Sequence, residues 1–337
     1  MAICRIFLCT YRRNHLLRRA LDSLLAQTVT DWVCELHNDD PRDSFPRQLV
    51  EKINDPRISI VDHAENLGPT RTFNLIFREV SEPFISLLED DNWWQPNFLE
   101  EMIEVMEKFP EVHVAWANMR FWLEENDETW TDTGRNIWEH SETAPPELFH
   151  WPHRRQIRGA LHSNGAMIVR SQSAKQYVIP EKIKFGGTEA IRERAFHFPI
   201  LFVPQVLANF SITKETSRSK NRLDFAQKQV LLVGSFLKHV PVKEETLSSI
   251  WHDARSKPAK STGTLFFAAL IFPECRKLLK HTLISDWLFF IALSLKRPLS
   301  SWQIFKSVAS NQELWDFLDQ QTALRAKEAQ EQGFKGM

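Results

Sequence analysis

The alternation of short apolar runs with helical patterns constrains the fold of this chain more than any other feature of its sequence. The runs are Ile3–Cys9, Trp32–His37, Ile58–Val61, Phe84–Leu88 and Val112–Trp116. Each has the length of a strand, and Phe84–Leu88 is a short continuous apolar run, which is typical of strands buried on both faces. Helical patterns separate the runs. This alternation predicts an α/β fold with a doubly wound, mostly parallel sheet.

The helical patterns can be read from side-chain spacing. Leu17, Leu21 and Leu24 fall at spacings of four and three, which places them on one face of a helix. Similar patterns cover Thr72–Val80 and Phe98–Phe109. These segments fill the gaps that crossover helices of a parallel sheet would occupy.

The chain beyond residue 120 gives weaker signals. Residues 121–149 mix acidic side chains with tryptophans without a period, and we expect a long loop or lid there. Strand patterns return at Ala166–Arg170 and Leu201–Val203. From there we expect a less regular part over residues 121–220 and a helical C-terminal region over residues 221–337.

Composition excludes several classes of protein. The 42 Lys and Arg residues balance 43 Asp and Glu residues, and a net charge of −1 gives no field that attracts a nucleic acid. No apolar run reaches the roughly 18 residues that a membrane span needs. The N-terminal run meets Arg12 and Arg13 without a cleavage site, and the four cysteines have no C-x-x-C spacing. We predict a cytoplasmic protein with buried, reduced thiols.

Glycine usage restricts the kind of nucleotide site. Gly68 is the only glycine among the first 133 residues. The dinucleotide fingerprint and the P-loop both need several glycines after a strand, so neither is present. The glycine-rich opening loop of nucleotidyltransferases is missing as well. Any bound nucleotide would therefore have its phosphates held by a metal ion and side chains.

Three polar clusters follow predicted strands, at Thr10–Arg12, Asn38–Asp40 and Glu89–Asn92. Ligands of open parallel sheets bind at the carboxyl ends of the strands. Neighbouring carboxylates raise one another's pKa, and a divalent cation removes that cost. Because Mg²⁺ binds one or two carboxylates together with substrate phosphates, Glu89–Asp91 predict such a site. An acidic N-cap for a helix beginning near Pro96 is the other interpretation.

Four segments in order carry a more specific pattern. Thr10–Arg13 and Leu21–Thr28 come first, followed by Asn66–Gly68 with Asn74, and then by Leu87–Leu99, where the acidic cluster precedes two tryptophans and a proline. Together they resemble the segments of family-2 inverting glycosyltransferases with the GT-A fold. The resemblance covers residues 3–120 and extends loosely to about 215. It implies a nucleotide-sugar-binding half over 1–120 and an acceptor-binding, catalytic-base half over 121–220, before the helical extension at 221–337.

The resemblance also implies roles for individual residues. The implied donor contacts are Thr10, Tyr11, Arg12, Asp39, Arg71 and Asp90. Thr10 and Tyr11 would line the nucleobase pocket, and Asp39 would accept a hydrogen bond from the base N–H, which favours uracil or thymine. Arg71 would neutralise the donor diphosphate. Asp90 would lie near the ribose.

The implied metal ligands are Asp91 and Glu89, for Mg²⁺ or Mn²⁺. The family's motif opens with Asp, so Glu89 is a departure, and its longer side chain would reach the metal through water. An inverting transfer also needs one general base for the acceptor hydroxyl. By resemblance that base is Glu189, which follows Gly186 and Gly187 and stands with Thr188 where the family has a Glu-Asp pair. The alternative is a surface Glu that begins a helix.

Other candidates are weaker. His150 and His153 have a metal-like spacing, but Pro152 lies between them and favours a loop. The family's late histidine ligand has no counterpart near Thr213–Ser217. Three basic residues there are candidates for diphosphate binding or for a solvated loop: Lys214, Arg218 and Lys220. No Q-x-x-R-W motif of processive synthases occurs.

The resemblance as a whole implies an inverting transferase. It would move one sugar from a UDP- or dTDP-sugar to a saccharide or lipid-linked saccharide, in surface polysaccharide or glycolipid synthesis. Two alternatives remain, a catalytically weak GT-A domain that serves as a scaffold and a metal-dependent nucleotidyltransferase. The basic-edged C-terminal helices predict packing on the catalytic domain, a homodimer interface, or peripheral contact with the inner face of a membrane.

Overall fold

The computed structural model describes most of the chain, in the ranges 2–126, 129–183, 189–214, 222–256 and 258–337. It divides into two compact units. The first consists of Met1–His150 and His162–Thr216, and the second of Trp151–Leu161 and Ser217–Met337.

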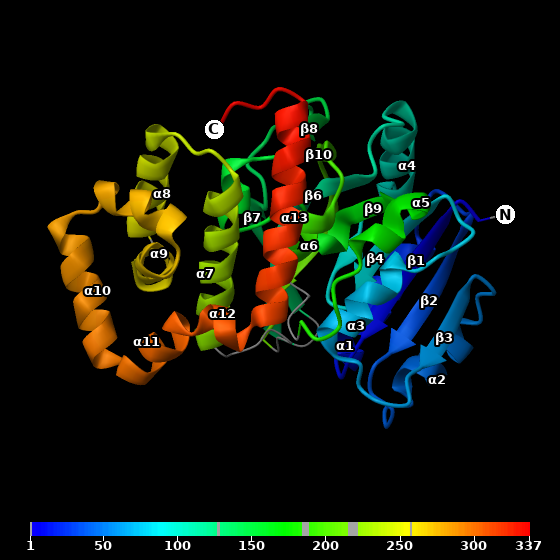
Figure 1. Ribbon diagram of the computed structural model, residues 1–337. Helices are drawn as coiled ribbons and strands as arrows, with labels where there is room; N and C mark the ends of the chain where they lie inside the picture. The colour runs from blue at the N-terminus through cyan, green and yellow to red at the C-terminus, as the bar shows by residue number, and fades with distance from the viewer. Residues whose placement is uncertain (1, 127–128, 184–188, 215–221, 257) are drawn as a thin grey trace. The chain divides into compact units, whose positions relative to one another are not determined.

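The first unit is built on one mixed sheet, with β1 to β3 side by side in blue in Figure 1. Its main path runs β3-β2-β1-β4-β9-β6-β10-β5, while β7 pairs with β6 and β8 with β10. The neighbours β3-β2-β1-β4 are parallel, as are β6 and β10. The strands are β1 (Cys4–Thr10), β2 (Trp32–Asn38), β3 (Ile58–Asp62), β4 (Phe84–Glu89), β5 (Trp93–Trp94), β6 (Val114–Asn126), β7 (Thr129–Asn136), β8 (Glu147–Phe149), β9 (Met167–Arg170) and β10 (Ile200–Ile212). The parallel half of the predicted sheet is confirmed.

Helices separate the strands of this unit, and the first four of them fall in the gaps between the predicted strands. They are α1 (Asn14–Leu25), α2 (Phe45–Ile53), α3 (Gly68–Asn74), α4 (Phe98–Lys108), α5 (Ser171–Ala174) and α6 (Glu189–Arg192). In α1, Leu17, Leu21 and Leu24 are fully buried in the core, together with Leu8 of β1 and Leu36 of β2. The apolar stripe therefore faces the sheet, and the expected helix is confirmed.

Three sequence-based assignments are corrected. Residues 121–149 are not a long loop, because β6 continues to Asn126 and β7 pairs back on it. The strand expected at Leu201–Val203 is much longer, since β10 continues through Pro204 with shifts of register beyond Val203. A proline inside a strand normally argues against one, and here it coincides with the irregularity. The helix expected over Thr72–Val80 instead begins at Gly68 and tightens into a 3-10 turn that ends at Phe77.

The second unit is helical in its described residues beyond 221, as expected. Its helices are α7 (Arg222–His239), α8 (Glu244–Ser256), α9 (Pro258–Ile271), α10 (Ile284–Lys296), α11 (Pro298–Phe305), α12 (Ser307–Ser310) and α13 (Gln312–Glu331), with a 3-10 segment η6 at Pro273–His281. The central helix is α7, which contacts both α9 and α13. A Cβ on Gly234 would lie 2.3 Å from the ring of Phe272, so glycine allows this ring to lie against α7.

No helix among the described residues has both the length and the apolar character needed to cross a membrane. The four cysteines are free thiols, and Cys4, Cys34 and Cys275 are buried, as expected from their spacing.

Candidate functional site

The three predicted polar clusters meet at one edge of the sheet. In the parallel register Thr10 lies opposite Asn38, and Cys9 lies opposite Glu89. The clusters that follow β1, β2 and β4 are therefore neighbours, as the rule for ligand sites in parallel sheets requires. The Thr10 hydroxyl donates a hydrogen bond to Asp90 at 2.9 Å, which joins the first cluster to the third.

Arg13 forms the electrostatic centre of this edge. One guanidinium nitrogen bonds Asp90 and the other bonds Asp91. Asp90 is fully buried, and burial raises its pKa to about 7 although Arg13 and Thr10 oppose the shift. This role of Arg13 is not predicted from the sequence. The sequence feature that indicates it is the position of Arg13 beside Arg12, after β1.

Glu89 lies in a tight pocket at the end of β4. It accepts a hydrogen bond from Asn92 at 2.8 Å, and a Cβ on Gly165 would lie 2.9 Å from its carboxylate and 2.6 Å from the Asn92 amide. Gly165 therefore permits the close approach of a third chain segment. Burial raises the pKa of Glu89 to about 8, and the charges of Asp91, Glu189 and Asp90 add to that shift. Three other carboxylates thus act on Glu89, and the Arg13 guanidinium opposes their effect.

This arrangement fits a hard divalent cation. A cluster of three or more His, Cys, Asp or Glu side chains in metal-binding geometry is absent from the described residues. Mg²⁺ needs fewer, because it binds one or two carboxylates and completes its shell with water and substrate phosphates. Burial, together with the charges of Asp91, Glu189 and Asp90, disfavours the charged form of Glu89, and a cation near Glu89 and Asp91 would favour it. Asp91 remains partly accessible, with a side chain 19% exposed.

The helix-cap interpretation of Glu89–Asp91 is wrong. The next long helix, α4, begins at Phe98, and its N-cap residue is Asn97, whose side chain makes no capping hydrogen bond. The acidic residues in its first turn are Glu100 and Glu101.

The backbone at Asp91 is braced by a group that the sequence does not predict. Arg19 of α1 donates to the Asp91 carbonyl at 3.0 Å and to the Ser211 hydroxyl at 2.9 Å. Its guanidinium lies 3.8 Å from the ring centres of both Trp93 and Trp130. Burial lowers the pKa of Arg19 to about 10. Arg19 is therefore a positioning residue for the acidic loop.

Asp39 lies close to the site but is engaged within the protein. Its carboxylate accepts from the backbone N–H of Leu67 at 2.7 Å and of Gly68 at 3.3 Å. It also contacts Thr72 at 3.3 Å and His63 at 3.1 Å. Gly68 has a φ of +72°, a backbone conformation that favours glycine. Because the Asp39 carboxylate accepts hydrogen bonds from this segment, it stabilises the turn that begins α3.

The remaining predicted donor contacts lie at the more exposed side of the same edge. Arg12 lies 4.8 Å over the ring of Tyr11 and bonds Asp40, and this bond lowers the pKa of Asp40. Arg71 of α3 is exposed and bonds Glu65 at 2.9 Å. Glu65 raises the pKa of Arg71 most, and Asp39 adds a smaller effect.

Glu189 is the first residue of α6, and its charge reaches the acidic cluster through Glu89. It also acts on Arg192, whose pKa burial lowers to about 9. Arg192 donates to the Asn74 side chain and the Tyr177 carbonyl, both at 3.2 Å. Asn74 of the predicted N-x-G … N pattern thus positions the turn of helix that carries Glu189. The preceding residues Gly186–Thr188 lie outside the described part of the chain.

The weaker candidates that the structure describes do not join this site. His153 caps the 3-10 turn η2 (Arg154–Ile157), where it accepts from the backbone of Arg155 at 3.2 Å, as a loop residue does. Lys214 bonds Glu124 through its backbone N–H and Glu125 through its side chain. Arg218 and Lys220 fall outside the described residues.

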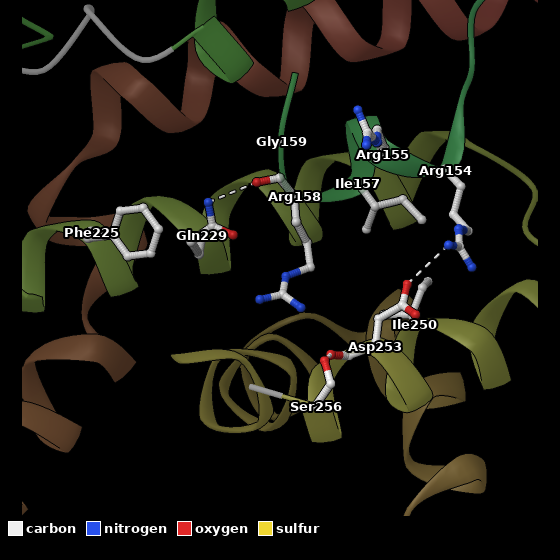
Figure 2. A pocket seen from close by; sticks show the side chains of 10 residues that line it. All are labelled: Arg154, Arg155, Ile157, Arg158, Gly159, Phe225, Gln229, Ile250, Asp253 and Ser256. Carbon is white, nitrogen blue, oxygen red and sulfur yellow. Dashed lines mark hydrogen bonds and ion pairs between the residues drawn. The ribbon is translucent and has the colours of Figure 1, made fainter. Parts of the chain in front are cut away.

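The second unit has a cavity of its own, of about 550 Å³, shown in Figure 2. Arg154 pairs with Asp253 across it at 3.2 Å, and the Gln229 side chain donates to the Arg158 carbonyl at 2.9 Å. None of the predicted site residues lines this cavity, and its charges are partly paired within it.

We expect the acidic cluster to make the protein less stable as the pH rises. A carboxyl whose pKa is higher in the folded state holds a proton that the unfolded chain has released, so folding is favoured at low pH. Glu89 and Asp90 should therefore lower the free energy of unfolding as the pH rises from about 4 to about 8. Urea unfolding at several pH values, in EDTA, measures this slope.

Glu89→Gln should reduce that slope, and Glu51→Gln on the exposed side of α2 serves as the matched control. An unchanged slope in Glu89→Gln would show that the Glu89 carboxyl does not titrate in this window.

Comparison with known proteins identifies a family and relatives of part of the chain. The family model described as "Glycosyl transferase family 2" matches residues 5–174. A glucosyltransferase of Escherichia coli, WfgD, named for transfer from UDP-Glc to GlcNAc-diphosphoundecaprenol, is 28% identical over 103 residues, or 31% of this chain and 40% of the relative. A putative colanic acid biosynthesis glycosyl transferase of E. coli K12, WcaA, is 31% identical over 96 residues, or 28% of this chain and 34% of the relative. Each alignment spans less than half of the curated relative.

Solved structures share the fold over nearly the whole chain. S. aureus TarS 1–349 in complex with UDP-GlcNAc matches with a TM-score of 0.56 at 12% identity, covering 99% of this chain and 92% of that one. Mannosyltransferase PcManGT from Pyrobaculum calidifontis, in complex with GDP-Man and Mn²⁺, matches with a TM-score of 0.50 at 12% identity, covering 96% and 87%. At this identity the likeness shows the fold alone, and the expected GT-A fold is confirmed.

Proposed function

We propose that this chain, which belongs to glycosyl transferase family 2, transfers one sugar from a UDP- or dTDP-sugar to a saccharide or lipid-linked saccharide. The observation that carries the proposal is the acidic cluster of Glu89, Asp90 and Asp91 at the carboxyl edge of the sheet, where the ends of β1 and β2 meet it. No glycine-rich loop is needed there, because a cation and basic side chains would hold the diphosphate.

The donor would bind along this edge. Thr10, Tyr11 and Arg12 would line the base and ribose pocket, with Asp90 held behind them by Arg13. Asp39 would accept a hydrogen bond from the base N–H. To do so, its carboxylate would give up one of its hydrogen bonds from the Leu67–Gly68 turn. Arg71 would turn from Glu65 to the diphosphate. These are rearrangements of exposed or hydrogen-bonded groups, not of the core.

A divalent cation would stabilise the negative charge of the leaving diphosphate, held by Asp91 directly and by Glu89 through water. The relative crystallised with GDP-Man and Mn²⁺ supports this use of a metal ion. Arg13 would keep the carboxylates of Asp90 and Asp91 in place before and after the cation binds.

Glu189 would act as the general base. The acceptor hydroxyl would attack C1 of the sugar on the face opposite the diphosphate, so that its O–H bond breaks, a C1–O bond forms, and the bond from C1 to the phosphate oxygen breaks. The proton would pass to the Glu189 carboxylate, and the configuration at C1 would invert. The charge of Glu189 acts on Glu89, and this supports the assignment because the base must lie close enough to the donor site to reach the acceptor hydroxyl at C1.

We assign residues 1–120 to the donor, residues 121–220 to the acceptor and base, and residues 221–337 to a helical extension. The named activity of WfgD and the colanic acid assignment of WcaA support a lipid-linked saccharide acceptor and a role in polysaccharide synthesis. We propose that the chain acts on the cytoplasmic side. The helical extension would contact a membrane or a second copy of the chain.

A second candidate is a scaffold domain with weak catalysis. It is favoured by Glu89 in place of Asp, and by the engagement of both Asp90 and Asp91 with Arg13. A nucleotidyltransferase remains as the third candidate. It would release pyrophosphate, whereas a glycosyltransferase releases nucleoside diphosphate.

Calorimetric titration with UDP, dTDP, GDP and ADP, each with Mn²⁺ and with EDTA, tests the proposal. We expect binding of UDP or dTDP alone, and tighter binding with Mn²⁺. Binding that Mn²⁺ leaves unchanged would favour the scaffold, and the absence of any nucleotide binding would overturn the donor site.

A further inference from the structure

The helices α10 and α11 expose large apolar side chains to solvent. Six of them are between 49% and 81% exposed. We call them the α10–α11 apolar surface: Ile284, Leu288, Ile291, Leu295, Leu299 and Trp302. A soluble protein rarely leaves a contiguous set of such side chains open unless the set binds something.

The exposed residues form one face of a helix whose other face is already buried. Ile284, Leu288, Ile291 and Leu295 fall at spacings of four, three and four, which places them on one stripe. On the other side of α10, Phe290 is buried against Phe266 and Phe267 of α9, with ring centres 4.7 and 5.1 Å apart. Figure 1 shows α10 (orange) at the edge of the second unit, with α9 on one side of it. Packing within the unit therefore accounts for only one of the two apolar faces.

The charges around this surface have one sign. Between residues 282 and 310 the only acidic side chain is Asp286, which is buried and paired with Arg255 at 2.7 Å. The basic residues of the same segment are Lys296, Arg297 and Lys306. Lys296 and Arg297 lie where α10 passes into α11. The Lys306 ammonium lies 4.7 Å over the ring of Trp302.

The apolar side chains and the positive charges together indicate which kind of partner this surface binds. A second copy of the same surface would bring together two sets of three positive charges, which repel. An anionic lipid bilayer complements both properties, because acyl chains accept the apolar side chains and phosphate headgroups accept the basic ones. Trp302 beside Lys306 suits the boundary between the two, where tryptophan is enriched.

We propose that the α10–α11 apolar surface binds peripherally to an anionic lipid membrane. The helices would lie in the plane of the interface, with Leu288 and Leu295 directed into the acyl region. The inference goes beyond sugar transfer, since it depends on no residue of the nucleotide site. It would keep the protein at the surface where lipid-linked substrates lie.

Flotation with vesicles of phosphatidylcholine, alone or mixed with phosphatidylglycerol, tests the proposal. We expect the wild-type chain to float with the mixed vesicles and to remain behind with phosphatidylcholine alone. Leu288→Gln with Leu295→Gln should weaken binding at least about tenfold, because each loses most of a buried leucine's transfer free energy. Lys296→Gln with Arg297→Gln should weaken it about tenfold or more, since each basic residue near such a surface contributes about 1 kcal/mol.

Leu324→Gln is the matched control, because Leu324 is also exposed but lies on α13. It should bind as the wild type does, and circular dichroism should show that all variants are folded. Wild-type protein that stays unbound with the mixed vesicles overturns the proposal. A dimer detected by light scattering also overturns it, if the dimer dissociates in Leu288→Gln with Leu295→Gln and neither the wild type nor any variant floats. Nucleotide titration of the same samples separates failure here from failure of the proposed function.

Discussion

Replacing Asp91 by Asn is expected to remove the Mn²⁺-dependent part of donor binding. Asp91 is the accessible carboxylate of the acidic cluster, and a neutral amide of the same size would leave the cation without its direct ligand. Loss of an outer-shell partner costs metal affinity about 10–100-fold, so loss of the ligand should cost at least about 100-fold. Titration of UDP in Mn²⁺ and in EDTA measures the difference, which should nearly vanish in the variant.

The matched control is Asp22→Asn. Asp22 is an exposed carboxylate on α1 that pairs with Arg18, and its loss should leave the Mn²⁺ effect unchanged. The melting temperature of Asp91→Asn should stay near that of the wild type, because Arg13 keeps its bond to Asp90 and the Asp91 carbonyl keeps Arg19. A full Mn²⁺ effect in Asp91→Asn would rule out Asp91 as the metal ligand.

The parts of the fold that the sequence predicts are those whose pattern depends on burial. The strands β1, β2 and β4 are mainly apolar because most of their side chains are buried, and α1 shows a clear stripe because one face is covered. The strand β7 is different, since most of its side chains are exposed and no apolar period marks it. Its position follows from pairing with β6, which is a tertiary contact that no local pattern records.

The residues of the candidate site also fall into those that the sequence predicts and those that only tertiary contacts reveal. The sequence predicts the three clusters at the strand ends because each directly follows an apolar run. Arg19 could not be predicted, since it meets Ser211 from a position 192 residues away. Gly165 could not be predicted either, because its reason is the close approach to Glu89 and Asn92 across the sheet edge. Residues that position the loop come from distant segments, whereas residues of the loop itself are local.

Glu189→Gln is expected to spare donor binding and to remove turnover. Glutamine keeps the volume of the side chain but cannot accept the acceptor's proton, and general base catalysis contributes typically about 10²–10⁴-fold to the rate. The affinity for UDP in Mn²⁺ should change little, because Glu189 touches the cluster through charge alone among the described contacts. Release of UDP, followed with the acceptor that best supports turnover, should therefore fall by a similar factor in kcat.

The comparison with a second glutamate makes that loss interpretable. Glu79→Gln removes an exposed carboxylate that pairs with Lys175, and it should turn over normally. If Glu189→Gln lost donor affinity as well as turnover, Glu189 would act on the donor site as a whole and not as the base. If it turned over at the normal rate, the proton would go to another group, and the buried carboxyls beside it are the next to be replaced. A selective loss of kcat at unchanged affinity is the outcome that the base assignment predicts.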